Sequence, residues 1–147
     1  MYETVVIATD GSPSGVRAIE TALDLAERFD AAVHALYVVD EGSVDAVPDD
    51  VKQDMLGRQR NRGMEALAVV AAQAPMSVET VVRSGDPAAE ICEYVEEAGA
   101  DVVAMGTRGR HGDHSILLGS VAEHVVRSCP APVLTVRQLG EDEQAAD

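Results

Sequence analysis

The order of strand-like and helix-like segments is the feature that most constrains the fold of this chain. Short continuous runs of β-branched residues alternate with stretches in which apolar residues recur at steps of three and four. Continuous apolar runs are typical of strands buried on both faces. Strands of this kind, separated by helices, predict one open parallel sheet with right-handed crossovers and helices on both faces. Five strands are predicted, at 3–10, 31–40, 78–85, 100–106 and 131–137.

Turn and capping residues mark where the intervening helices begin and end. The first helix is expected to be capped by Ser12 or Ser14. In the third helix Asp86 is the expected cap, Pro87 opens the first turn and Gly99 ends the helix. Helices are predicted at about 13–29, 48–73, 87–98 and 119–128.

The second of these helices has a less regular pattern than the others. Gly57 and Gly63 lie within it, so the sequence leaves open whether the helix is continuous or broken. Residues 41–50 before it have the composition of a loop. The residues expected on its inward face are Val51, Met55, Met64, Leu67 and Ala71.

Length and composition indicate a single domain with an aliphatic core. The chain has 147 residues, of which 46% are hydrophobic and only 3% aromatic. We expect one α/β domain over residues 1–137, followed by a disordered acidic tail at 138–147. Cys92 and Cys129 match no zinc or redox spacing and are expected to be small buried hydrophobes. His34, inside the second strand, is expected to be a buried histidine with a hydrogen-bond partner.

The start of the chain and its hydropathy bear on where the protein resides. No apolar run approaches the roughly 20 residues that span a bilayer. The first residues, "MYETVVIATDGS", lack the basic start and the cleavage site of a signal peptide. A cytoplasmic location is therefore expected.

The charge balance disfavours polyanionic partners and also opposes the binding of an anionic ligand. The formal net charge is −15, with a single lysine, Lys52, against ten arginines. Nucleic acids and acidic membranes are disfavoured by such a charge. Excess acid with almost no lysine suggests adaptation to a salty cytoplasm, and an ordinary acidic protein from a GC-rich genome is the alternative. An anion could bind only where local backbone donors overcome the overall field.

The stretch "MGTRGRHGDHSILLGS", residues 105–120, could supply such donors. Gly106 and Gly109 follow the fourth strand, and Gly119 and Ser120 open the last helix. Glycines let backbone approach a ligand, and a helix start presents free N–H groups to an anion. If the first and fourth strands are neighbours, this loop and Asp10 line the crevice where open α/β sheets bind ligands. The alternative is that these glycines are ordinary turn residues.

Several other nucleotide and phosphate signatures are missing. The chain has no G-x-x-x-x-G-K-[ST] motif and no G-x-G-x-x-G after the first strand, where it reads "DGSPSG". A phosphorylated receiver domain is also disfavoured, because Asp10 stands alone and the fifth strand ends in Arg137 rather than lysine.

Taken together, residues 2–137 resemble the ATP-binding branch of the universal stress protein family. Gly106, Gly109, Gly119 and Ser120 fit its G-x2-G-x9-G-[ST] motif, and "VVIATDGSPSG", "VRSGDPAAEI" and "GSVAEHVVRSCPAPVLTVR" are similar in order. The resemblance implies a Rossmann-like fold of the adenine nucleotide α-hydrolase type, with strand order 3-2-1-4-5. It also implies a homodimer that pairs through the fifth strand. The side chains expected at that interface are Val133, Leu134 and Val136.

The same resemblance implies a site for ATP, AMP or ADP. The ends of the first two strands would meet ribose and adenine, Met105 would line the pocket, and the glycine motif would surround ribose and phosphates. The implied site residues are Ala8, Thr9, Asp10, Val39, Met105, Gly106, Gly109, Gly119, Ser120 and Val121. Mg²⁺ or Mn²⁺ could accompany the phosphates, since magnesium commonly binds through substrate phosphates and keeps its waters.

One departure from the family pattern lies inside the glycine motif. His111, Asp113 and His114 could simply be solvated or could bind a transition metal, and Asp113 adds negative charge near the phosphates.

Three functions are consistent with these residues. The first is a nucleotide-binding stress or regulatory protein without fast turnover. The second is a slow ATPase or nucleotide-transfer enzyme, although Arg108 and Arg110 are the only nearby cations for a γ-phosphate and no catalytic residue is assigned. The third is a ligand-free interaction module, which the intact glycine spacing disfavours.

Overall fold

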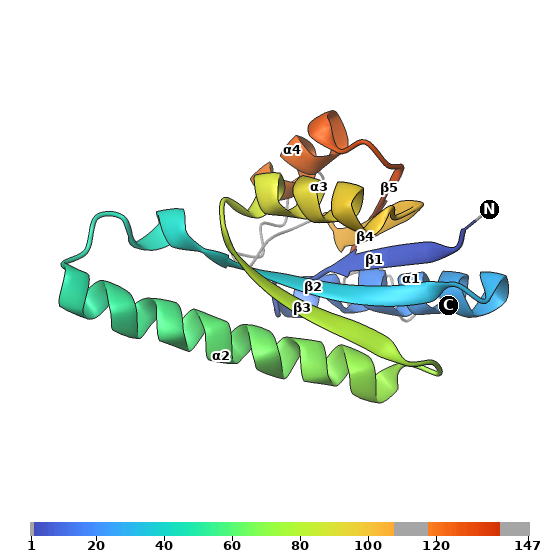
Figure 1. The fold of residues 1–147 in the computed structure, drawn as a ribbon, viewed down its shortest axis with the longest axis horizontal. Helices are drawn as coiled ribbons and strands as arrows, with labels where there is room; N and C mark the ends of the chain where they lie inside the picture. Colours follow the sequence, from blue (N-terminus) through green and yellow to red (C-terminus); the bar gives the residue numbers. More distant parts are fainter. Residues whose placement is uncertain (1, 108–117, 139–147) are drawn as a thin grey trace.

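A five-stranded parallel sheet forms the centre of the computed structural model, which describes residues 2–107 and 118–138 (Figure 1). Neighbouring strands follow the order β3-β2-β1-β4-β5, so the predicted fold class and strand order are confirmed. All four strand pairs are parallel. The strands are β1 (Thr4–Ala8), β2 (Ala32–Asp40), β3 (Val78–Gly85), β4 (Val102–Gly106) and β5 (Val133–Val136).

Two pairs of helices cover the two faces of this sheet. Helices α1 (Val16–Phe29) and α2 (Asp49–Gln73) pack on one face, and α3 (Pro87–Ala98) and α4 (Ser120–Ser128) pack on the other (Figure 1). Side chains alternate along each strand, so β1 sends Val5 and Ile7 to the first core and Val6 to the second. Both cores are largely aliphatic, as the composition predicts.

The expected ends of α3 are confirmed, whereas the expected cap of α1 is wrong. The Asp86 carboxylate accepts the Ala89 N–H at 3.1 Å, and Gly99 ends α3 with a φ of 63°. Before α1, Pro13 opens a turn of 3₁₀ helix, η1 (Pro13–Gly15), which delays the α-helix to Val16. Gly15 is then the cap residue of α1, and neither it nor Ser12 caps through a side chain.

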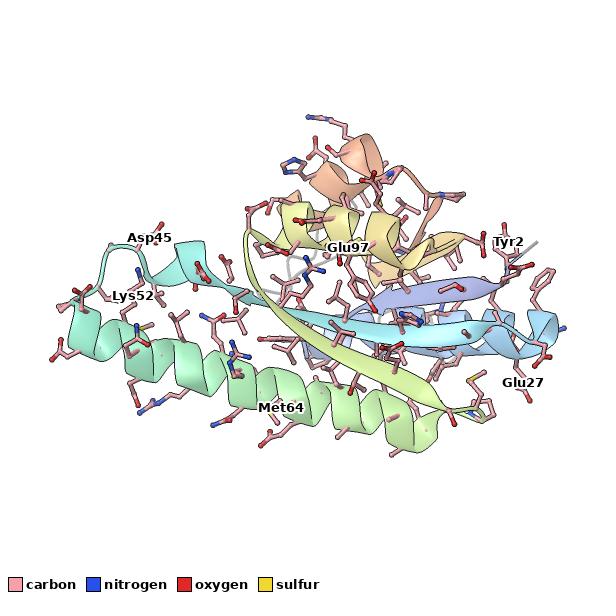
Figure 2. The ribbon with its side chains drawn as sticks, in the orientation of Figure 1. Tyr2, Glu27, Asp45, Lys52, Met64 and Glu97 are labelled. Atoms are coloured by element: carbon pink, nitrogen blue, oxygen red, sulfur yellow. The ribbon has the colours of Figure 1, made fainter. Side chains whose placement is uncertain are left out.

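Helix α2 is continuous, but its buried face differs from the predicted one. Its buried positions are Gln59, Gly63, Leu67 and Val70, spaced by four, four and three residues. Of the residues expected to face inward, Val51, Met55, Met64 and Ala71 are exposed. Met64 lies on the side of α2 away from the sheet (Figure 2). The prediction failed because two residues on the true inward face, Gln59 and Gly63, carry no apolar side chain.

The first turns of α2 extend past the sheet together with a short 3₁₀ segment, η2 (Glu41–Val44) (Figure 1). Across the described ranges, no helix is long and apolar enough to cross a membrane. Several sequence predictions fall outside these ranges. They concern Gly109, His111, Asp113 and His114, and also the acidic tail apart from Gln138.

Candidate functional site

The carboxyl ends of β1 and β4 lie side by side. Val5 pairs with Val102 and Ile7 with Ala104, so this register brings the end of β1 next to the end of β4. Residues 8–10 and 105–106 therefore lie together at the carboxyl ends of these strands, where the strand order reverses. In open α/β sheets this is the position at which ligands bind.

Local hydrogen bonds give the chain after β1 a defined turn. The Thr9 hydroxyl accepts the Gly11 N–H at 3.1 Å, and the Asp10 carboxylate accepts the Ser12 N–H at 2.9 Å. Gly11 adopts a φ of 79°, a conformation that favours glycine. This turn places a carboxylate at the end of β1.

Helix α4 begins at the same edge, directly beside β4. The Gly119 N–H donates to the Thr107 carbonyl, and the Thr107 N–H donates to the Val136 carbonyl at 3.2 Å. Gly119 is the cap residue and, as a glycine, has no side chain with which to cap the helix. Ser120, the first residue of α4, is exposed. The first turn of a helix has N–H groups without intrahelical partners and carries the positive end of the dipole. The start of α4 is therefore suited to an anion placed beside β4.

The pairing of β2 determines which of its backbone groups face this edge. The Thr9 N–H donates to the Leu36 carbonyl at 3.0 Å, so the polar backbone groups of Leu36 face β1. Alternate residues of a strand turn these groups to opposite neighbours. The N–H and carbonyl groups of Val38 therefore point toward the side of β1. Those of Val39 point toward β3, where Val39 is in register with Ser84. The backbone of Val38 is therefore a candidate contact for a ligand, and the sequence analysis did not single it out.

Helix α2 also approaches this edge, which the sequence gave no reason to expect. A Cβ built on Gly11 would lie 3.5 Å from the Ala66 Cβ and 3.9 Å from the Arg62 Cγ. The aliphatic part of the Arg62 side chain therefore lies beside the turn after β1.

The structure thus brings together most of the predicted site residues that it describes. Ala8, Thr9 and Asp10 lie next to Met105 and Gly106 through the β1–β4 register. Gly119 is tied to Thr107, and Ser120 and Val121 follow it in the first turn of α4. Val39 is the exception, because its side chain is buried in the core beneath α2 and its backbone faces β3.

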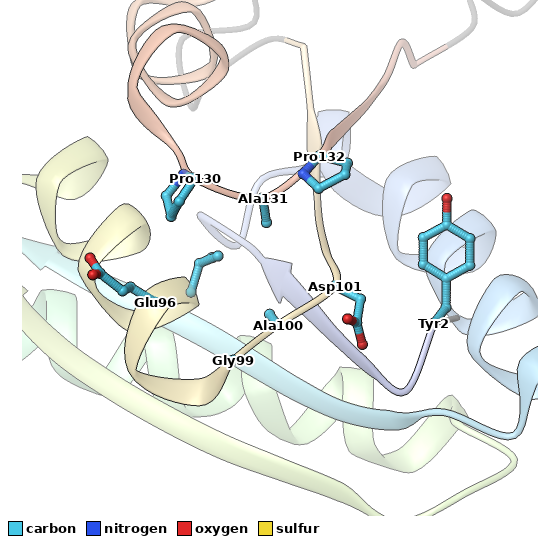
Figure 3. A pocket seen from close by; sticks show the side chains of 9 residues that line it. Tyr2, Glu96, Gly99, Ala100, Asp101, Pro130, Ala131 and Pro132 are labelled. Atoms are coloured by element: carbon cyan, nitrogen blue, oxygen red, sulfur yellow. The ribbon is translucent and has the colours of Figure 1, made fainter.

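Two pockets lie away from the adjoining ends of β1 and β4. One, of about 420 Å³, is at the amino ends of β1, β4 and β5, with Tyr2, Asp101 and Pro132 among its lining residues (Figure 3). There the Asp101 carboxylate accepts the N–H groups of Glu3 at 2.8 Å and Thr4 at 3.0 Å. These bonds lower the pKa of Asp101. The other pocket, of about 260 Å³, lies between α2 and the ends of β2 and β3.

Polar contacts join α3 to β3 and β2, on the side of the sheet away from β4. Arg83 of β3 pairs with Glu90 at 3.1 Å and with Glu97 at 2.7 Å. The bond to Glu97 raises the pKa of Arg83, an effect that burial opposes and the charges of Glu97 and Glu90 reinforce. His34 is half-buried and contacts the Tyr94 hydroxyl at 2.7 Å, so the expected partner is present.

The two cysteines lie close together although they are distant in sequence. Both are half-buried and free. Burial raises the pKa of the Cys92 thiol to about 11, with a further contribution from a hydrogen bond to Cys129. Over residues 2–107 and 118–138, no group of three or more His, Cys, Asp or Glu is placed to hold a metal ion.

The parallel sheet and its strand order define a Rossmann-like open α/β protein. Residues 1–137 match the model of the universal stress protein family, and the chain belongs to that family. A universal stress protein of Methanocaldococcus jannaschii is 38% identical over 142 residues, which cover 94% of this chain and 84% of the relative.

Solved structures of the family share the fold. The universal stress protein UspA from Lactobacillus plantarum has a TM-score of 0.82 at 26% identity and covers 92% of this chain and 98% of its own. A universal stress protein in complex with cAMP has a TM-score of 0.70 at 28% identity, with coverages of 94% and 99%. A family member from Arabidopsis thaliana with AMP bound has a TM-score of 0.67 at 25% identity, with coverages of 99% and 97%.

Proposed function

We propose that this protein binds an adenine nucleotide between the ends of β1 and β4 and serves a regulatory role in the stress response. The observation that carries the proposal is the start of α4, whose cap residue Gly119 is tied to Thr107 at the end of β4. Support also comes from two similar solved proteins, which hold cAMP and AMP. Assignment to the ATP-binding branch of the family is part of the proposal.

Each part of the nucleotide would meet a different element. The phosphates would accept N–H groups at the start of α4 from Ser120 and Val121, with Gly106, Gly109 and Gly119 allowing close backbone approach. Ribose would lie near Ala8, Thr9 and Asp10, and Met105 would form part of the wall. The base would lie toward the end of β2, where the sequence points to Val39 and the backbone direction favours Val38.

Local dipoles can hold an anion here despite the net charge of −15. The helix N–H groups act at contact distance, whereas distant carboxylates are screened, with a Debye length of about 8 Å at physiological ionic strength. Asp10 is a carboxylate at this edge, so a cation bound to the phosphates would reduce its repulsion. We include Mg²⁺ or Mn²⁺ in the proposal in this role, held through the phosphates of ATP, ADP or AMP.

Thermal unfolding with and without nucleotide tests the proposal. The protein is heated in molar KCl with ATP, with AMP and with neither, each with and without Mg²⁺. A ligand at a hundredfold excess over its dissociation constant stabilises the folded state by about 2.7 kcal/mol. Gly119→Leu should abolish the effect and still fold, because Gly119 has a φ of −64° and a ψ of 162°, which leucine can adopt.

Ala68→Leu, at an exposed position of α2, is the matched control and should respond as the wild-type protein does. No shift with any adenine nucleotide would contradict the proposal and favour a ligand-free interaction module. Sustained release of phosphate from ATP would instead favour a slow ATPase.

We also propose that two copies pair through β5. In the described part of the sheet β5 is an edge strand, paired with β4 alone. The Val103 N–H donates to the Pro132 carbonyl and the Thr107 N–H to the Val136 carbonyl, so the backbone groups of Val133 and Thr135 face outward. An open edge of this kind can accept a second strand, with Val133, Leu134 and Val136 near the contact.

Thr135→Pro tests this arrangement, because proline removes an outward N–H and spares the bonds to β4. Sedimentation should show a dimer for the wild-type protein and for Thr135→Ser, and a monomer for Thr135→Pro. A monomeric wild-type protein, or a Thr135→Pro variant that stays dimeric, would contradict pairing through β5.

The proposal takes residues 1–137 as the folded unit and places the protein in the cytoplasm of a cell with high internal salt. The acidic composition with a single lysine supports this setting. Denaturation in increasing KCl should then show stability rising up to molar salt, and a flat response would contradict salt adaptation.

A further inference from the structure

Gln59 is a buried amide at the edge of the proposed site. It has 7% of its surface exposed, and among residues 2–107 and 118–138 it is the one buried side chain carrying an amide or a charge. Burying an amide costs free energy unless its donors and acceptor are bonded. The hydrogen-bond partners of the Gln59 amide therefore indicate the structural role of this residue.

The amide pairs with the last residue of β2. The Asp40 N–H donates to Gln59 Oε1 at 3.0 Å, and Gln59 Nε2 donates to the Asp40 carbonyl at 3.4 Å. Gln59 Nε2 also donates to Ser43 Oγ at 2.9 Å, and that hydroxyl donates to the Asp40 carbonyl at 2.7 Å. The side chain thus takes the place of a neighbouring strand at Asp40.

The position of Gln59 depends on the close approach of α2 to β2. Gly63, one turn further along α2, lies against the ring of Tyr37, and a Cβ there would overlap the ring. Because the helix backbone comes so near the sheet, the side chain of Gln59 reaches the backbone at the end of β2.

Among residues 2–107 and 118–138, the bonds to Asp40 leave one backbone position of β2 without a partner on this side. Leu36 is bonded to Thr9, the residue after β1, and Asp40 is bonded to Gln59. Val38 lies between them and turns its N–H and carbonyl the same way. A donor and an acceptor side by side can bind the edge of a base that offers the complementary pair, as adenine does with N1 and its amino group.

We propose that Gln59 is a positioning residue that holds the end of β2 so that the Val38 backbone meets the base of the bound nucleotide. This inference rests on the proposed function. It assigns Gln59 to recognition of the base and leaves the phosphate contacts of α4 independent of it.

Titration calorimetry with two ligands separates these contributions. AMP carries base, ribose and phosphate, whereas ribose 5-phosphate lacks the base. Gln59→Met keeps a similar side-chain length and loses all three amide hydrogen bonds. AMP should bind this variant roughly tenfold more weakly, which corresponds to about 1.4 kcal/mol, and ribose 5-phosphate should bind with unchanged affinity.

Gln73→Met is the matched control, since Gln73 is exposed at the end of α2, and it should bind both ligands as the wild-type protein does. Ser43→Ala removes one contact of the amide at an exposed position outside the core. It should shift the AMP affinity in the same direction by a smaller factor. This variant keeps the inference testable if Gln59→Met does not fold.

Hydrogen exchange gives a second measurement. The Asp40 amide should be protected in the wild-type protein and should exchange faster in Gln59→Met. Equal weakening of AMP and ribose 5-phosphate, or no change in either, would overturn the role of Gln59 while leaving nucleotide binding intact. A wild-type protein that binds no adenine nucleotide would overturn the proposed function, and this inference with it.

Discussion

Gly63 of α2 lies against the aromatic ring of Tyr37 in β2, leaving no room for a methyl group. Gly63→Ala should therefore destabilise the protein by about 1–3 kcal/mol, the usual cost of overpacking a core. The loss occurs even though alanine is the better helix former. Chemical denaturation measures the free energy of unfolding.

Gly57→Ala is the matched control within the same helix. A Cβ at Gly57 meets nothing within 4 Å. This variant should gain up to about 1 kcal/mol from helix propensity alone. Equal effects of the two substitutions would show that the contact with Tyr37 is not what keeps Gly63 free of a side chain.

Asp86 should contribute to stability through the cap of α3. Its carboxylate accepts the Ala89 N–H, so Asp86→Ala leaves that donor without its partner. We expect a loss of about 0.5–2 kcal/mol in the free energy of unfolding. Asp86→Asn keeps an acceptor oxygen and should lose less. If the alanine and asparagine variants are equally unstable, the cap is not the cause.

Asp101 should make stability depend on pH in the acid range. The N–H groups of Glu3 and Thr4 lower its pKa in the folded state, so its stabilising effect is fully present above the unfolded value of about 3.9. The effect is lost as the pH falls through the lower folded pKa. Asp101→Asn should therefore unfold over a flatter pH profile below pH 4, measured by denaturation at each pH.

The wild-type profile and the Asp101→Asn profile should converge at the lowest pH, where the carboxyl is protonated. Parallel profiles across the acid range would show that Asp101 does not carry this dependence.

Cys92 should react slowly with alkylating reagents at neutral pH. Burial and the bond to Cys129 raise its pKa to about 11, so little thiolate is present at pH 7. Its rate of modification by iodoacetamide, followed by mass spectrometry, should rise about tenfold per pH unit until the pH approaches 11. Unfolded protein is the control and should reach its plateau at lower pH. A native plateau near pH 8.5 would contradict the raised pKa.

Local signals in the sequence were sufficient for the strands and most helix ends, whereas the strand order followed from the resemblance to a known family. Asp86, Pro87 and Gly99 act within one turn of their own helix. The inward face of α2 was not predictable in this way. It is set by Gln59 and Gly63, whose fit depends on Asp40 and Tyr37 in another element.

The candidate site was partly predictable for a related reason. Gly106, Gly119 and Asp10 stand at strand and helix ends that periodicity can locate. The direction in which Val38 and Val39 turn their backbone groups depends on the register with β1 and β3, which no local pattern encodes. The stem of Arg62 beside Gly11 likewise results from the path of α2 across the sheet.

The hydrogen bond from the Gly119 N–H to the Thr107 carbonyl brings two residues that are twelve positions apart in the sequence into contact. Thr107 directly follows β4 and Gly119 is the cap residue of α4, so one backbone hydrogen bond couples the start of this helix to the end of that strand. A change of backbone conformation at Thr107 or Gly119 should therefore shift the start of α4 and the end of β4 together.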